Sequence, residues 1–237
     1  MPVITISRQF GSAGVPIGRA LADRFDAEFL DRKIVALVAA RAGIPENEAE
    51  GYDERLPSLW QRIASALAAS SPEVAVPPMP YEHMPSAATH ERLVAITRTV
   101  IEEAAGRGNV VIVGRGAAFV LGRGRRDVVH VQLHASMEAR IRYLLTRVEE
   151  IPLETRPDEH SLEELCRSVD RARSEYIRRL FRANWTDATN YDLALDSGRL
   201  GVARSVALIE MVAREGVAEV STPPEPQAAR DAPESER

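Results

Sequence analysis

The residues with the clearest chemical potential stand at the start of the chain. The apolar run Val3–Ile6 is followed by the segment Ser7-Arg8-Gln9-Phe10-Gly11-Ser12-Ala13-Gly14, and a helical stretch begins near Ile17. A strand, a loop of small residues and a helix can bind phosphate, because loop N–H groups close round the anion and the helix N-terminus adds partial positive charge. The pattern predicts four phosphate-binding residues, Gly11, Ser12, Ala13 and Gly14.

The loop lacks the side chains that usually accompany such a cradle. The common pattern G-x-x-x-x-G-K-[ST] supplies a Lys for the β- and γ-phosphates and a hydroxyl for Mg²⁺, whereas Val15 and Pro16 follow Gly14 here. Lys33 is the only lysine, so 29 of the 30 basic residues are arginines. Arg8, just before the loop, is the best local cation to replace the lysine; a salt bridge at the sheet edge is its alternative role.

Four segments, in this order, resemble the cytidylate kinases. They are Ile4–Gly18, Gly114-Arg115-Gly116, Val131–Arg140, and Asp192–Asp196 followed by Ser197. In that family these positions hold the phosphate loop, a Gly-Arg-Asp segment, a strand-to-helix turn and the closing strand. The resemblance covers roughly residues 3–215. It is strongest to the divergent cytidylate-kinase-like branch, whose loop reads Ser-Arg-Gln-Phe-Gly-Ser-Gly-Gly.

The resemblance implies both a fold and a reaction. The fold is α/β, a three-layer P-loop NTPase type with a five-stranded parallel sheet, helices on both faces, a helical insertion for the nucleoside monophosphate and a helical lid. The reaction transfers the γ-phosphoryl group of ATP to CMP or dCMP, with Mg²⁺ bound alongside the nucleotide. Phosphoryl transfer depends on positioning and on stabilising spread negative charge. Arginines suit it, because guanidinium groups pair bidentately with phosphate oxygens.

The resemblance assigns catalytic roles to arginines. Besides Arg8, these are Arg115, which matches the Gly-Arg-Asp arginine, Arg140 at the start of the lid, and Arg173 within it. An arginine placed where the buried strand Val110–Val113 ends is hard to explain as packing. The next position departs from the family, because Gly116 replaces the aspartate that helps to read cytosine.

Two further groups are implied to bind substrate. In the lid, Arg167, Asp170 and Arg173 have R-x-x-D-x-x-R spacing, so they share roughly one helix face and the carboxylate can orient both arginines. The alternative is a solvated face with ion pairs. The second group consists of Asp31 and Arg32, which follow the second strand, and Arg92 on a later helix, with Arg98 as the other candidate. A helix N-cap with a solvated neighbour is the alternative for Asp31 and Arg32.

Alternating strand and helix patterns predict the elements that must position these residues. The expected strands are Val3–Ile6, Glu28–Leu30, Val110–Val113, Val128–Leu133 and Leu193–Leu195. The expected helices are Ile17–Phe25, Asp31–Arg41, Leu56–Ala69, His90–Ala105, Met137–Glu149, Leu162–Phe181 and Val202–Arg214. Ser161 and Glu164 are typical of a capping box that opens the helix at Leu162.

The organisation is that of a single domain over residues 1–216. It carries a nucleoside-monophosphate-binding type of insertion at 43–89, which contains a Pro-rich stretch at 72–85, and a lid at 150–190. A Pro- and Glu-rich tail, 217–237, is expected to be disordered.

The composition of the chain limits the classes of molecule that it is expected to bind. A net charge of −5 argues against general nucleic-acid binding, and small-molecule nucleotides are the expected ligands. The chain shows no leader and no membrane-spanning run, which favours a cytoplasmic protein. Cys166 is expected to be an inert helix residue. The five histidines lack metal-binding spacing, and His130 and His134 are expected to face solvent or a helix end.

Two classes of function remain open. One is an active nucleoside monophosphate kinase, favoured by the order of the segments and the arginines kept at Arg115 and Arg173. The other is a nucleotide-binding regulatory protein without catalysis, favoured by Val15, Pro16 and the lack of an Asp after Val110–Val113 to hold Mg²⁺. A kinase of another small metabolite is a third possibility.

Overall fold

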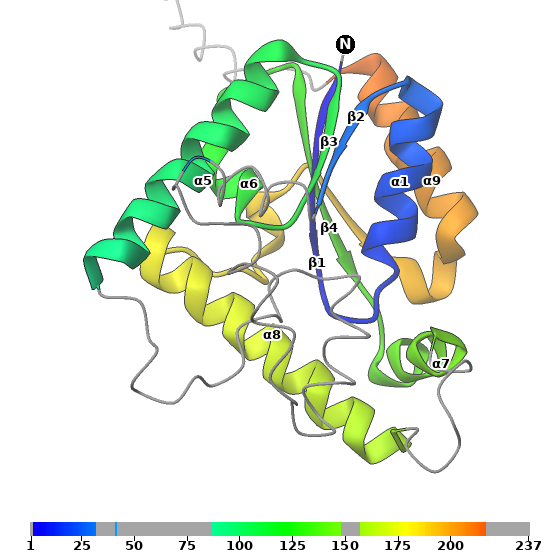
Figure 1. The fold of residues 1–237 in the computed structure, drawn as a ribbon. Helices are drawn as coiled ribbons and strands as arrows, with labels where there is room; N and C mark the ends of the chain where they lie inside the picture. The colour runs from blue at the N-terminus through cyan, green and yellow to red at the C-terminus, as the bar shows by residue number, and fades with distance from the viewer. Residues whose placement is uncertain (1, 32–40, 42–86, 148–156, 217–237) are drawn as a thin grey trace, which may run out of the picture.

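The computed structural model describes residues 2–31, 41, 87–147 and 157–216. Five strands form one parallel sheet in the order β2-β3-β1-β4-β5 (Figure 1). The strands are β1 (Val3–Arg8), β2 (Glu28–Leu30), β3 (Val110–Val113), β4 (Val128–His134) and β5 (Leu193–Asp196). The α/β class and all five predicted strands are confirmed.

The central strands are buried because they are apolar on both sides, as expected for a parallel sheet covered on both faces. β1 pairs with β3 and β4 at once, so Ile4 lies opposite Val111 on one side and Val129 on the other. Successive side chains point to opposite faces. Ile4 therefore packs in one core cluster while its neighbour Val3 packs in the other.

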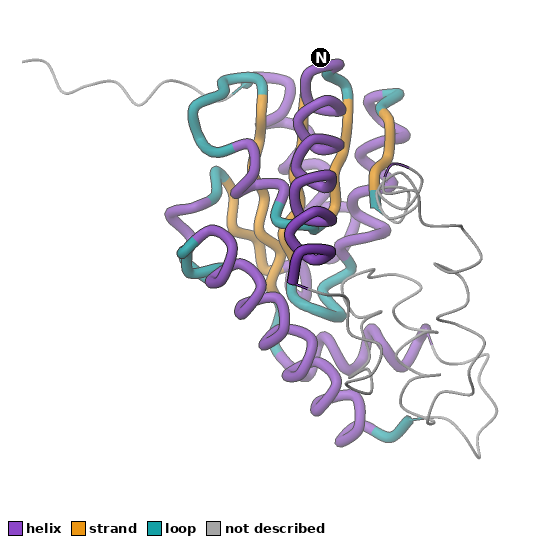
Figure 2. Tube along the Cα trace, turned by 60° about the vertical axis from the view of Figure 1, so that its left-hand side comes forward, coloured by secondary structure: helices purple, strands orange, loops and turns teal. Residues whose placement is uncertain are grey.

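Helices cover both faces of the sheet (Figures 1 and 2). On one face α1 (Gly14–Phe25) packs against α9 (Ser197–Glu215), which is interrupted at Gly201. On the other face α5 (Ala87–Arg107) packs against the short α6 (Ala117–Leu121). The pattern of apolar residues predicted α1, α5 and the main part of α9, but it missed α6 and started α1 at Ile17 instead of Gly14.

Two further helices lie at the carboxyl ends of the strands (Figure 1). They are α7 (Met137–Arg147) and α8 (Glu159–Phe181), and they enclose a third core cluster that includes Phe10. The capping-box prediction was wrong, because α8 starts earlier: the side chain of its N-cap, Asp158, accepts a hydrogen bond from the Ser161 N–H.

Several predictions fall outside the described residues. They concern Arg32, Lys33, the predicted helices at 31–41 and 56–69, nearly all of the 43–89 insertion and the 217–237 tail. Within the described residues, no helix has the length and apolar character needed to cross a membrane.

Candidate functional site

The loop between β1 and α1 (Gln9–Ala13, hereafter the β1–α1 loop) turns sharply. Gly11 and Ala13 have φ of +80° and +57°, and Ser12 between them does not. Alternation between left-handed and ordinary backbone brings successive N–H groups together into a concavity that binds anions. The loop therefore has the backbone form of an anion site, even without a lysine.

Side chains from other elements hold the carbonyl groups of this loop. The Phe10 carbonyl accepts a hydrogen bond from Arg140 Nε at 2.6 Å. The Ser12 carbonyl accepts one from Ser197 Oγ at 2.8 Å. Both donors lie outside the loop, at the start of α7 and of α9. The loop carbonyls are thus turned towards the protein.

The N–H groups face the other way. In a planar trans peptide the N–H points opposite to the preceding C=O, so the N–H groups of Gly11 and Ala13 point away from Arg140 and Ser197. The Ala13 carbonyl accepts the Ile17 N–H, which orients the Gly14 N–H along the helix start. Ala13, the N-cap of α1, supplies no side-chain cap. The first turn of α1 therefore keeps its positive end for a ligand.

Arg8 lies beneath this loop. It is the last residue of β1 and only 3% exposed, and its Nη2 lies 4.0 Å from Asp31 Oδ1. Its stem crosses the start of α1, where a Cβ on Gly14 would lie 2.8 Å from Arg8 Cγ. Arg8 therefore has the salt bridge that was its alternative role, although it lies on the central strand and not at the sheet edge.

Further polar contacts fix the loop to β4. The Gln9 N–H donates to the Leu133 carbonyl at 2.9 Å, and Gln9 Oε1 accepts from the Ala135 N–H at 3.1 Å. Ser12 Oγ donates to the Gln9 carbonyl at 2.8 Å. Sequence reasoning assigned no role to Gln9 or Ser197. The only available signal was their place inside the segments that resemble the cytidylate kinases.

α8 brings a charged cluster onto the loop. Asp170 Oδ1 accepts from the Phe10 N–H at 2.9 Å, and Asp170 Oδ2 pairs with Arg140 Nη2 at 2.5 Å. Arg173 Nη1 donates to the Arg8 carbonyl at 2.7 Å and lies 3.7 Å from Asp170 Oδ1. The structure therefore gathers three of the predicted site residues, Arg140, Asp170 and Arg173, around the start of the loop.

Arg167 does not join this cluster. Its exposed guanidinium pairs with Glu163, one turn earlier on α8, at 2.5 Å. The ion-paired, solvated face that was the alternative for the lid motif therefore describes Arg167, whereas Asp170 and Arg173 face the loop.

Burial shifts the pKa values of two side chains near the loop, Asp170 and Cys166. It raises the pKa of Asp170, against the opposing effects of Arg140, the Phe10 N–H and Arg173. The neighbouring Cys166 is fully buried, and burial raises the pKa of its thiol to about 11. A thiol that stays protonated is a poor nucleophile, which agrees with the expectation of an inert cysteine.

A second loop follows β3. Gly114, Arg115 and Gly116 all have positive φ, at +80°, +56° and +66°. β1 and β3 are neighbours, yet α1 and α6 leave them for opposite faces of the sheet. Such a reversal opens a crevice at the carboxyl ends of parallel strands, and ligands bind there in open α/β sheets.

A pocket of about 400 Å³ lies beside this second loop, between α5, α6 and α8. Its polar side includes Arg98, Arg115 and Tyr176, and its apolar wall includes Val120 and Phe181. Arg98 was the alternative to Arg92, whose side chain lies outside the described residues. Two arginines and two aromatic rings give this pocket the chemistry to hold a phosphorylated, ring-containing molecule.

The surroundings of Gly116 are crowded, which bears on why this chain has glycine where the family has aspartate. A Cβ there would lie 2.9 Å from Phe181 Cε2, and the backbone is left-handed. A side chain at this position would therefore require the Phe181 ring to shift.

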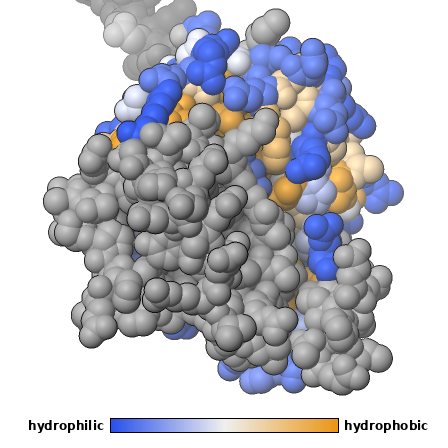
Figure 3. Space-filling view, viewed as in Figure 1, coloured by the Kyte–Doolittle hydropathy of each residue, from blue (hydrophilic) through white to orange (hydrophobic). Residues whose placement is uncertain are grey.

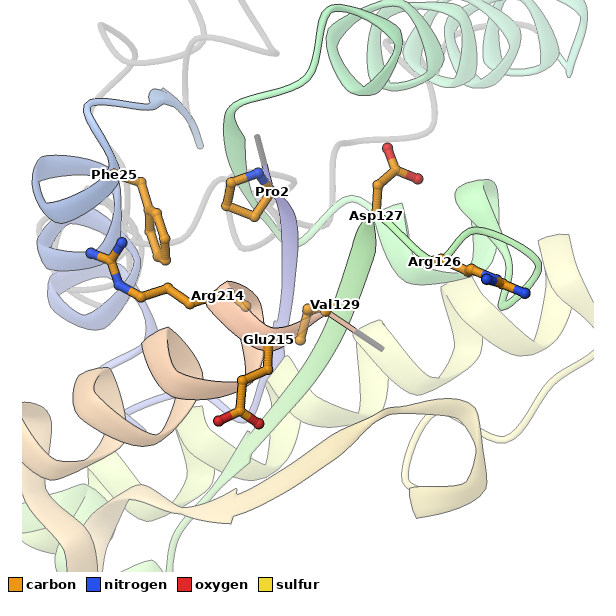
Figure 4. Close-up of a pocket in the computed structure, with 9 residues that line it drawn as sticks. Pro2, Phe25, Arg126, Asp127, Val129, Arg214 and Glu215 are labelled. Carbon is orange, nitrogen blue, oxygen red and sulfur yellow. The ribbon is translucent and has the colours of Figure 1, made fainter. Parts of the chain in front are cut away.

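A second pocket, of about 410 Å³, lies at the amino ends of strands β1 and β4 (Figure 4). Pro2 and Asp127, which line it, precede β1 and β4, so it is far from the carboxyl-end crevice. On the part of the described surface that is visible in Figure 3, hydrophilic residues lie along the outer margin and apolar residues lie inside it.

His130 does not face solvent, which was one of its two predicted surroundings, but it does face a helix end, because Gly122 is the C-cap of α6. It is 1% exposed in the middle of β4, with Nδ1 2.7 Å from Thr5 Oγ1 and Nε2 2.9 Å from the Gly122 carbonyl. His134 is exposed, as expected. Among the described residues, no group of three or more His, Cys, Asp or Glu side chains could hold a metal ion.

The fold is that of a three-layer α/β protein, with a five-stranded parallel sheet between helices. A sequence profile of the cytidylate kinase-like family matches residues 3–199. The chain therefore belongs to the cytidylate kinase-like family, and its scaffold is that of a nucleotide-binding kinase.

One solved structure shares the fold, and a second resembles it more weakly. An uncharacterized protein from Eubacterium ventriosum is 16% identical with a TM-score of 0.58, over 90% of this chain and 99% of that one. A shikimate kinase from Bacteroides thetaiotaomicron is 15% identical with a TM-score of 0.44, over 89% of this chain and 97% of its own. No curated protein matches the chain.

Proposed function

We propose that this protein transfers the γ-phosphoryl group of ATP to a nucleoside monophosphate, with CMP or dCMP as the acceptor. Family membership supports the reaction type. The observation that carries the proposal is the set of loop carbonyls held by Arg140 and Ser197, which leaves the N–H groups of Gly11 and Ala13 facing outward. This arrangement suits the phosphates of a donor nucleotide.

Arg8 has the role that the missing lysine would otherwise take. Its stem packs against Gly14 at the start of α1, and its guanidinium lies beside Asp31. A guanidinium remains charged when buried and can pair with two phosphate oxygens. Asp31 holds Arg8 in place from β2.

The pocket that contains Arg98 and Arg115 is the acceptor side of the proposed site. It lies on the α6 side of the crevice, across from the β1–α1 loop. The arginines would bind the acceptor phosphate, and Tyr176 and Phe181 would flank its ring. Gly116 offers no side chain to read cytosine, so the preference for CMP rests on the family alone.

Mg²⁺ would enter with the ATP phosphates and neutralise part of their charge. The loop supplies no hydroxyl after Gly14, and Ser12 Oγ already donates to Gln9. The residues present do not fit the usual loop ligand for the metal, so no protein ligand is assigned to it. The protein's own contribution is positioning and positive charge, which are the main requirements of phosphoryl transfer.

The test is a coupled ADP-release assay with ATP, Mg²⁺ and each of CMP, dCMP, UMP, AMP and GMP. Turnover with a pyrimidine monophosphate is expected. Arg8→Ala should lower kcat by about 10²–10³-fold, because it removes a preorganised charge at the transferred group. Arg115→Ala should mainly raise the KM of the acceptor. Arg178→Ala, on an exposed position of α8, is the control.

A second candidate function has its own support. Val15 and Pro16 provide neither a lysine nor a hydroxyl, which favours a nucleotide-binding regulatory protein. In calorimetry, ATP binding without turnover would select this candidate. Neither binding nor turnover with any nucleotide would contradict both candidates.

A further inference from the structure

The peptide groups on either side of Phe10 are held from two directions. The Phe10 N–H donates to Asp170 Oδ1 at 2.9 Å, and the Phe10 carbonyl accepts from Arg140 Nε at 2.6 Å. Asp170 Oδ2 and Arg140 Nη2 are themselves paired at 2.5 Å. The contacts form a closed ring of one residue from the loop, one from α7 and one from α8.

This ring is well shielded from water. The side chains of Arg140 and Asp170 are 5% and 16% exposed. Charge-assisted hydrogen bonds are stronger and more directional in such surroundings than at a surface. Removing Asp170 would leave the buried Arg140 guanidinium without its carboxylate partner. Asp170 is therefore in a position to fix both the Phe10 peptide and the guanidinium that holds its carbonyl.

The same ring sets the direction of the Gly11 N–H. The Phe10 carbonyl and the Gly11 N–H belong to one peptide, so the bond from Arg140 to that carbonyl fixes where the N–H points. α7 also packs tightly on the loop, since a Cβ on Gly11 would lie 3.1 Å from Arg140 Cβ. A change at Asp170 should reach the loop through Arg140 and the Phe10 N–H.

We propose that Asp170 is a positioning residue for the phosphate donor: through Phe10 and Arg140 it holds the β1–α1 loop in the form that presents its N–H groups. The resemblance to the family had implied instead that Asp170 contacts substrate. The catalytic consequence rests on the proposed function, whereas the effect on the loop does not. The raised pKa of Asp170 agrees with its burial in this ring.

The test measures amide hydrogen exchange in the full-length protein by NMR. Asp170→Ala should accelerate exchange of the Phe10 amide by about tenfold or more, because it removes a charged acceptor. Asp170→Asn keeps an acceptor oxygen and should show a smaller increase. Ile4 and Ile6 in β1 serve as internal references. Glu175→Gln, which removes the same charge from an exposed position of α8, should behave like the wild type.

Nucleotide titrations complete the test. Both Asp170 variants should weaken ATP binding in calorimetry, by about tenfold for Asp170→Ala, and should raise the KM of ATP more than that of the acceptor. Unchanged Phe10 exchange with a raised acceptor KM would overturn the proposal and make Asp170 a substrate ligand. Faster exchange of the β1 reference amides in Asp170→Ala would indicate a general loss of stability. In that case the comparison of Phe10 with Ile4 and Ile6 is made in Asp170→Asn. If Asp170→Ala accelerates Phe10 exchange but the wild-type protein shows no turnover, the proposed reaction is contradicted and the role of Asp170 in holding the loop is supported.

Discussion

Gly14 is the residue at which the start of α1 has no room for a side chain. An added Cβ would lie 2.8 Å from Arg8 Cγ and 3.1 Å from Arg8 Cβ, so Arg8 or the helix must shift. Gly14→Ala should destabilise the protein by about 1–3 kcal/mol, as overpacking does, and should weaken ATP binding. Thermal and denaturant unfolding with calorimetry measure both effects.

Gly106→Ala is the matched control for that substitution. Gly106 lies within α5, and a Cβ there would have no neighbour within 4 Å. The change should stabilise the protein by about 0.5–1 kcal/mol, because alanine is the better helix residue. Equal effects of the two substitutions would contradict the close approach of Arg8 to Gly14.

His130 should make stability depend on pH. Its Nε2 donates to the Gly122 carbonyl, which can only accept, so the neutral ring can accept from Thr5 at Nδ1. Burial lowers the pKa of His130 below its ordinary value of 6.5, against the raising effects of the Gly122 carbonyl and Asp192. The folded state therefore favours the neutral ring. Its stabilisation is present above about pH 6.5 and is lost as the pH falls towards the folded-state pKa.

The pH dependence of the free energy of unfolding checks this assignment. Between about pH 7.5 and about pH 5.5, His130→Gln should flatten the curve, because the amide does not titrate there. His134→Gln, at the exposed end of the same strand, should keep the wild-type slope. A wild-type slope in His130→Gln would show that His130 is not the group responsible.

Individual residues were the hardest features to predict. Sequence reasoning selected Arg8, Arg140, Asp170 and Arg173, and the structure places these four residues around one loop. It could not separate Arg167 from them, because spacing alone does not show which helix face packs inward. The burial of His130 was missed because its hydrogen-bond partner Thr5 lies in β1, far away in sequence.

At the scale of elements, periodicity predicted all five strands and most helices of the described part. It missed α6, because the left-handed segment Gly114–Gly116 that redirects the chain into it gives no periodic signal. It placed the starts of α1 and α8 three residues too late. The predicted start of α1 was placed after Pro16, because proline usually interrupts a helix. Proline is nevertheless tolerated in a first turn, where the N–H has no helical partner.

The contact between α6 and α8 gives a prediction at this scale. Gly116→Asp, which restores the residue usual in the family, should destabilise the protein by about 2–4 kcal/mol, because it adds a left-handed strain to a clash with Phe181. Denaturant titration measures the loss. Gly124→Asp, at an exposed position with open space, should stay within about 0.5 kcal/mol of wild type. A stable Gly116→Asp variant would mean that α8 can move away from α6.

At the scale of the whole molecule, the order of the strands decides where the site lies. β1 is central and β3 is its neighbour, although more than a hundred residues separate them in sequence. Periodicity cannot supply that order, and the sequence analysis predicted only a five-stranded parallel sheet, without the order of its strands. The order places Arg8, the β1–α1 loop and Arg115 at one crevice, with α8 beside it.

The central claim is that the β1–α1 loop binds the donor phosphates through its N–H groups without a lysine. The most direct measurement follows the amide NMR signals of Gly11, Ala13 and Gly14 during titration with ATP and Mg²⁺. The account predicts saturable shifts at these amides in the wild type and weaker binding in Gly14→Ala. Turnover with CMP while these signals stay unchanged would contradict it, because the donor would then bind elsewhere.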